Sequence, residues 1–420
     1  MRITLQDDKE NQVSFSSFVK QTVRRFTKKE FIAILGSLLT LSATVVGLLS
    51  DLESINIHIV ELICQSQLSV FCLLALIGFL VVLLIVFCKN DNSEKHVIGT
   101  KNFNESIILL LDHSTRFEEY HYVIQLGTLL RQSPFIKSDN ELRIKIGQTL
   151  AFAYHNLADR INEATTYIED IGNSYLESGD VSAAIDNIQH GIEVVTKQCQ
   201  KLPPKSDSLD DALYIQIRGY RNLANCYSYR AKNTPQSKES DKRLATVAIE
   251  NAEKLVTQIQ SEEKKLAIIG DLYYAQSKIS QISKNWDNAI VHVQTSIDSY
   301  EKLRKQFSSD ANKRKCNESV IKNYRELGNL YLQKEEYQEA RDNLLIGLEK
   351  AKQLKDYENQ VLIYLLYCRI EMATDPNGQQ AKHFFDLADE VLLLVDSKKV
   401  YQEYYNVKKV FNRPTRKRRA

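Results

Sequence analysis

Arginine and asparagine recur four residues apart in this 420-residue chain, a spacing that places both side chains on one face of a helix. Arg221 precedes Asn225 in this way, and Arg325 precedes Asn329. An Arg guanidinium makes charge-assisted, often bidentate bonds to a carboxylate, each of about 1.5–3 kcal/mol. Because Arg is rarely buried without a partner, we expect both guanidinium groups to face solvent or a ligand. The pattern therefore indicates a surface for an acidic segment of a protein partner.

No motif of catalysis or cofactor binding accompanies these residues. The sequence lacks a Walker-type phosphate loop, a Gly-x-Gly-x-x-Gly fingerprint, a His-Glu-x-x-His zinc motif and a Gly-x-Ser-x-Gly elbow. Its seven Cys contain no Cys-x-x-Cys pair, and its eight His do not cluster at ligand spacing. We therefore expect a protein that is not an enzyme, with no catalytic residue, metal site or cofactor. The net charge of +2 gives no bulk field for nucleic acid, so no such partner is expected.

The elements that must position these side chains are predicted to be helices. Gly and Pro are scarce, with 14 and 6 residues, which favours long helices over turn-rich β structure. Tyr324, Leu327 and Tyr331 lie at i, i+3 and i+7 and form one packing stripe. Gly328 and Ala340 are small, as is required where two helices press together. The stretch 324–347 is therefore predicted to be an antiparallel helical pair.

This stretch resembles a tetratricopeptide repeat, whose pattern is Trp-x-x-Leu-Gly-x-x-Tyr followed by Ala-x-x-x-Phe. Tyr324 stands in the place of Trp, and Leu344 in the place of Phe. A copy at 168–191 has the same offsets, with its turn at Gly179 and Asp180. One hairpin cannot bury its own apolar face, so the resemblance implies an all-α solenoid of stacked repeats.

Further copies extend the pattern along the chain. One copy begins at Tyr220. The loop between its two helices, at 233–240, is predicted to be longer than the repeat pattern allows. In the next copy Gly270 precedes Ala289 by 19 residues, seven more than in the strong copies, which is about two helical turns. A degenerate copy follows Leu362, and a last helix from 400 to 411 is predicted to cap the array. The segment 120–157 is similar to helical repeats that follow signalling ATPases in bacteria.

The resemblance also implies which polar residues line the groove. In this family the first and fifth positions after the packing aromatic face the concave side of the solenoid. Here these positions hold Arg221 with Asn225, Arg325 with Asn329, and Glu169 with Asn173 in the second copy. The arrangement is similar to tetratricopeptide domains that clamp an acidic peptide terminus with Lys and Asn, with Arg in place of Lys. The alternative is that each Asn bonds to the backbone of a neighbouring repeat.

Two uncharged stretches precede the repeats. Residues 31–50 and 68–88 are each about as long as the ~20 residues that cross a bilayer. Basic residues flank them on the outer sides, whereas the connection at 51–67 has no Lys or Arg. The charge bias predicts two transmembrane helices with both chain termini in the cytoplasm, in the plasma or inner membrane if the source is prokaryotic. The alternative is a pair of buried core helices.

The predicted order is therefore a cytoplasmic segment (1–30), a transmembrane hairpin (31–88), a linker (89–114), a repeat domain (115–411) and a basic tail (412–420). The tail is either a solvated end or a contact for anionic lipid. We expect a membrane-anchored adaptor or scaffold that binds protein partners. Two alternatives stay open: a two-span effector whose hairpins oligomerise and perturb the bilayer, and a regulator of a membrane-associated enzyme.

Overall fold

The computed structural model describes residues 108, 111–112, 114–116, 118–132, 136, 139–375, 379–395 and 397–411. The chain divides into two units between Ile107 and Ile108, and the described residues lie in the second unit. The predicted transmembrane hairpin (31–88) and basic tail (412–420) fall outside the described residues. In the part that is described, no helix has both the length and the apolar character needed to cross a membrane.

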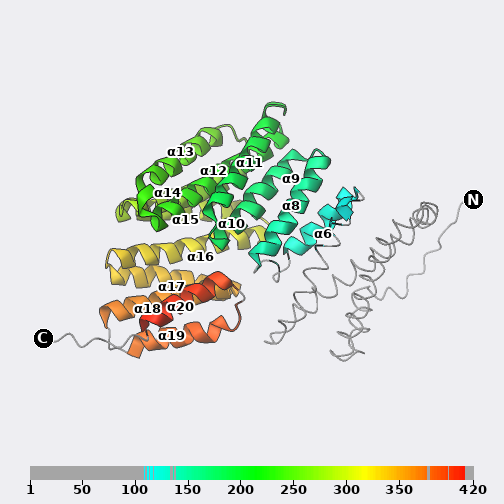
Figure 1. The fold of residues 1–420 in the computed structure, drawn as a ribbon. Coiled ribbons are helices and arrows are strands. Elements are labelled where there is room, and N and C mark those ends of the chain that lie inside the picture. Colours follow the sequence, from blue (N-terminus) through cyan, green and yellow to red (C-terminus); the bar gives the residue numbers. More distant parts are fainter. Residues whose placement is uncertain are drawn as a thin grey trace, which may run out of the picture. The chain divides into compact units, whose positions relative to one another are not determined.

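The regular structure of the described residues is entirely helical, as the sequence predicted. Six helical hairpins follow one another along the chain, and a final helix packs on the last of them (Figure 1). Their helices are α6 (Tyr120–Gln132) and α8 (Asn140–Asn156); α9 (Arg160–Thr165), η1 (Thr166–Ile171) and α10 (Gly172–Ser178) with α11 (Val181–Cys199); α12 (Asp207–Asn233) and α13 (Lys238–Val256); α14 (Glu262–Ile282) and α15 (Trp286–Gln306); α16 (Asp310–Gln333) and α17 (Tyr337–Leu354); α18 (Tyr357–Thr374) and α19 (Gln379–Leu392); and α20 (Lys398–Phe411).

The glycines of the two strong copies mark where paired helices touch. A Cβ added at Gly328 would lie 2.4 Å from the Leu344 side chain, and one at Gly172 would lie 2.5 Å from Ile188. Real side chains do not approach so closely, so a larger residue at either position would require the facing side chain to shift. Both contacts join residues sixteen apart in sequence, so the two copies have the same geometry. Together with the stacking of successive hairpins, this makes the array a tetratricopeptide-like solenoid.

Small residues of the second helices are buried at the same contacts. Ala184 of α11 and Ala340 of α17 have no exposed surface, which confirms the helical register read from the sequence. In α13 three small residues are also buried, namely Ala245, Ala248 and Ala252. The apolar stripe of each hairpin is thereby covered by its partner helix and by its neighbours.

A common turn joins many of these helices. A residue in the left-handed conformation ends one helix, and an Asp or Asn then caps the next helix through its side chain. The capping residues are Asp159, Asp180, Asn285 and Asp356, each accepting the backbone N–H three residues later at 3.0–3.2 Å. A cap of this kind contributes about 1 kcal/mol. Among the described turns, only that at Gly179 supplies the left-handed position with Gly, at φ +90°.

Two local features differ from the sequence expectation. The predicted long loop at 233–240 is short, because α12 continues to Asn233 and a single 3-10 turn at Pro235–Ser237 leads directly into α13. The second difference is in the first helix of the second copy, where the repeat pattern gave no sign of an irregularity. This helix contains the π-helical segment η1, which carries Glu169, and such segments often occur at functional sites.

The stretched copy has small residues at two successive places along its first helix, α14. Gly270 lies against the later turns of α15, where its carbonyl accepts the Ser296 hydroxyl at 2.7 Å and an added Cβ would meet the Tyr300 ring at 2.8 Å. Fully buried Ser277 stands twelve residues before Ala289, the spacing that Gly has in the strong copies. Gly270 and Ser277 are therefore both small buried residues of α14, two helical turns apart.

Candidate functional site

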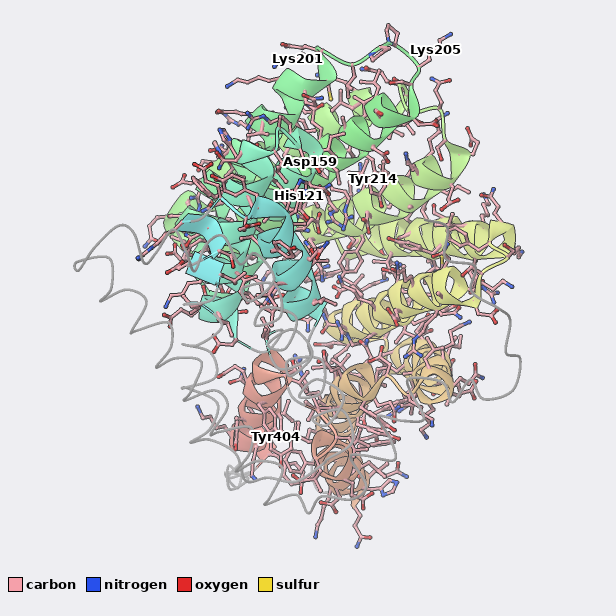
Figure 2. All side chains as sticks on the ribbon, turned by 90° about the vertical axis from the view of Figure 1, so that its right-hand side faces the viewer. His121, Asp159, Lys201, Lys205, Tyr214 and Tyr404 are labelled. Carbon is pink, nitrogen blue, oxygen red and sulfur yellow. The ribbon has the colours of Figure 1, made fainter. Side chains whose placement is uncertain are left out.

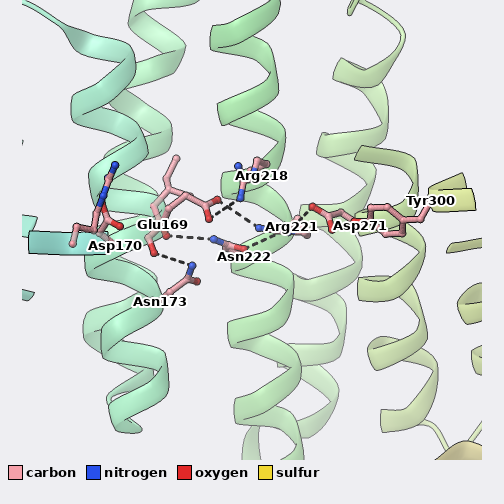
Figure 3. A network of polar contacts seen from close by, with 10 residues as sticks. Glu169, Asp170, Asn173, Arg218, Arg221, Asn222, Asp271 and Tyr300 are labelled. Carbon is pink, nitrogen blue, oxygen red and sulfur yellow. Dashed lines mark hydrogen bonds and ion pairs between the residues drawn. The ribbon is translucent and has the colours of Figure 1, made fainter. Parts of the chain in front are cut away.

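A network of charged side chains links the first helices of three consecutive hairpins. Arg221 of α12 reaches Asp271 of α14 at 2.6 Å and Glu169 of η1 at 3.5 Å, and Arg218 reaches the other oxygen of Glu169 at 2.9 Å. The Tyr300 hydroxyl donates to the second oxygen of Asp271. Figure 3 shows Arg221 lying between the two carboxylates. Two Arg and two carboxylates thus compensate one another.

Burial makes this network internal to the array. The side chains of Arg221 and Glu169 are only 16% and 17% exposed. Burial alone would lower the pKa of Arg221, but Asp271 and Glu169 outweigh it and raise the pKa above its usual range. The guanidinium is therefore charged and already satisfied. Burial, and then Asp271, raise the pKa of Tyr300 well above its ordinary value, so the phenol keeps the proton that it donates.

The predicted asparagines have separate environments. Asn173 donates to the Glu169 carbonyl of its own helix at 2.9 Å. Asn225 and Asn329 are half-buried, and neither side chain hydrogen-bonds to another described residue. The backbone bond to a neighbouring repeat is made instead by Asn222, which donates to the Ile168 carbonyl of the preceding hairpin at 3.3 Å.

Arg325 lies in a different place from Arg221, in a groove beside the start of α18. Its guanidinium donates to the Asn359 side chain, within the first turn of α18. The groove has a volume of about 760 Å³. It is lined by α16, the α17–α18 connection, α18, the α19–α20 connection and α20. The residues of α16 on its lining include Arg314, Lys315, Glu318, Ser319, Lys322 and Arg325.

Positive charge in this groove is in surplus. Arg314 is paired with Glu318 at 3.2 Å, but four other cations of the lining form no ion pair with a carboxylate among the described residues. These four are Lys315, Lys322, Arg325 and Lys355, which we call the basic wall. The carboxylate of Asp356 accepts the backbone and side-chain N–H groups of Asn359 as a helix cap. With Glu358 the lining holds five cations and three carboxylates, so it keeps a net positive charge.

Lys322 is held in place by an aromatic ring. Its ammonium lies 4.5 Å from the centroid of the Tyr274 ring, within the range of a cation–π interaction. Lys278 lies 5.0 Å from the same ring but is paired with nearly buried Glu326 at 2.6 Å. Burial opposes the charge on Glu326, yet Lys278 holds the pKa of that carboxyl below its usual range. The charge of Lys278 is thus neutralised, whereas that of Lys322 remains for a ligand.

Sequence reasoning missed two lysines of α16 that a simple signal would have found. Lys322 precedes Arg325 by three residues, and Lys315 precedes Lys322 by seven. Both steps keep side chains on one helix face. The partners of Arg221 gave no such signal, because Asp271 is 50 residues away along the chain.

Similarity to known proteins is found among solved structures, and it is low. No protein-family model matches the chain, and neither does a curated protein. Among solved structures, BtubC from P. vanneervenii is 16% identical, with a TM-score of 0.42 over 60% of this chain and 91% of its own. A signal transduction ATPase with a tetratricopeptide repeat sensor, from Pyrococcus horikoshii, is 14% identical, with a TM-score of 0.45 over 73% and 42%. A Rap protein complexed with competence and sporulation factor is 12% identical, with a TM-score of 0.45 over 76% and 88%.

Proposed function

We propose that this chain is a membrane-anchored adaptor that binds an acidic segment of a protein partner in the groove beside Arg325. Two spans at 31–88 hold it in the membrane, and the repeat array lies in the cytoplasm. The basic tail at 412–420 adds a contact with anionic lipid, and the chain carries out no catalysis. In this proposal the array is a scaffold on which a protein complex assembles.

One observation carries the binding site: four cations of the basic wall have no carboxylate partner in the described part of the chain. Lys315, Lys322 and Lys355 are exposed, so a carboxylate of a partner can reach them. Arg221 was predicted to bind a carboxylate of the partner, but it is already paired with Asp271 and Glu169. We therefore assign ligand binding to Arg325 and Lys322.

The anchor rests on the uncharged stretches and on the distribution of Lys and Arg around them. The state of the cysteines agrees with the proposed compartment, since Cys199, Cys226, Cys316 and Cys368 are free thiols. Free thiols are usual in a reducing compartment such as the cytoplasm.

Recovery of partners from native membranes tests the proposal. The full-length chain and its Lys322→Glu/Arg325→Glu variant are extracted in mild detergent, and the bound proteins are quantified by mass spectrometry. Lys201→Glu/Lys205→Glu is the matched control, because these two exposed lysines lie in the α11–α12 connection (Figure 2). We expect specific partners to be lost from the groove variant and retained by the control. Equal recovery from all three proteins would show that the groove is not the binding surface.

A further inference from the structure

The groove beside Arg325 has an apolar part as well as a basic one. Leu362 of α18, Leu394 and Val395 of the α19–α20 connection, and Val400 of α20 line it together with the basic wall. Leu394 is 46% exposed and Leu362 is half-buried, whereas Val395 and Val400 are buried. We call these four residues the apolar wall. A large apolar side chain exposed beside charged groups is typical of a protein interaction site.

The two walls come from different elements, and this arrangement restricts the ligand. α16 supplies three of the four cations of the basic wall, whereas the apolar residues come from α18, α20 and the connection before α20. A ligand that carries carboxylates alone would leave Leu394 in contact with water. A purely apolar ligand would cover Lys322 and Arg325 without pairing them, which is costly. The lining therefore suits a ligand in which both kinds of group are present.

We propose that the groove binds a mixed acidic and apolar peptide segment of the partner, with carboxylates on the basic wall and at least one large aliphatic or aromatic side chain on the apolar wall. This inference rests on the proposed function and makes it more specific. The charge complementarity sets orientation, and burial of the apolar side chain supplies affinity that salt does not screen. Binding of such a segment should therefore weaken with salt but not vanish at high salt.

Selection from a random peptide library tests this directly. Phage-displayed dodecapeptides are selected on the full-length chain in detergent, and the enriched peptides are then measured by fluorescence anisotropy. Two variants separate the walls: Lys322→Glu/Arg325→Glu changes the basic wall, and Leu394→Ser changes the apolar wall at a side chain that is already half exposed. Lys201→Glu/Lys205→Glu is again the control, and circular dichroism melts verify that each variant is folded.

We expect the enriched peptides to share Asp or Glu residues with a large apolar residue at a constant spacing. Each wall variant should weaken their binding by about tenfold or more, equivalent to ~1.4 kcal/mol, and the control should not. Acidic peptides without a shared apolar residue, unaffected by Leu394→Ser, would overturn this inference and leave the proposed function standing. Enriched peptides that bind all variants equally would overturn both.

Discussion

Removal of the Arg221 side chain is predicted to destabilise the array far more than removal of Arg325. In Arg221→Ala, Glu169 and Asp271 lose their shared cation while both remain largely buried, with side chains 17% and 28% exposed. Removal of one partner from a buried pair costs about 3–5 kcal/mol. Glu169 keeps Arg218, and Asp271 keeps the Tyr300 hydroxyl, so we expect the lower part of that range, about 3–4 kcal/mol.

Denaturant unfolding of the full-length chain, followed by circular dichroism, measures this difference. Arg325→Ala is the matched control, because Arg325 donates only to a neutral Asn359 side chain, a bond of about 0.5–1.5 kcal/mol. Arg221→Ala combined with Asp271→Asn should recover part of the loss, since the second change removes a carboxylate left without its cation. If Arg221→Ala and Arg325→Ala unfold at the same denaturant concentration, the network does not join the repeats as we describe.

Three further predictions concern packing, pH and topology. Ala340→Arg should lower stability by several kcal/mol, on the scale of ~1–3 kcal/mol for overpacking plus the burial of a charge, whereas Glu339→Arg on the exposed face should be nearly neutral in the same melt. Burial lowers the pKa of His292, whose Nδ1 is buried without a hydrogen-bond partner among the described residues, so the unfolded chain takes up that proton more readily than the folded one. Stability should therefore fall as pH drops through the ordinary value of 6.5, and a pH series of melts on His292→Gln should show a smaller fall. In intact cells, an impermeant thiol reagent should label Cys64 but not the cysteine introduced by Lys201→Cys. Labelling of the introduced cysteine would show that the predicted topology is inverted. Cys316 is only 3% exposed, so it would not report on the side of the membrane.

Much of the fold was predictable because its signals are local. The Gly328–Ala340 spacing and its repeat at Gly172 and Ala184 lie within single hairpins, and the structure places all four residues at helix contacts. The turns were harder to recognise. Only Gly179 carries the expected Gly, whereas Ala158, Lys284 and Lys355 adopt the same left-handed conformation. The following Asp or Asn cap was the better signal, since its side chain satisfies a free N–H of the next helix.

The candidate site was less predictable because its chemistry depends on contacts between hairpins. Arg221 and Arg325 occupy the same position in their repeats, yet one meets two carboxylates and the other meets Asn359. The sequence of one repeat contains no information about which residue of the next repeat faces it. The groove has a similar origin, because Leu394 comes from a connection some 70 residues after Arg325 along the chain.

Photo-crosslinking in native membranes tests the central claim most directly. A benzophenone amino acid replaces Lys315, an exposed residue of the basic wall, in one protein and Lys201 of the α11–α12 connection in another. Light should join the Lys315 position, and not the Lys201 position, to an acidic segment of one specific protein. The adduct should disappear when Lys322→Glu and Arg325→Glu are added. Adducts of equal yield from both positions, or an adduct at Lys315 that persists in the charge-reversed protein, would contradict the account.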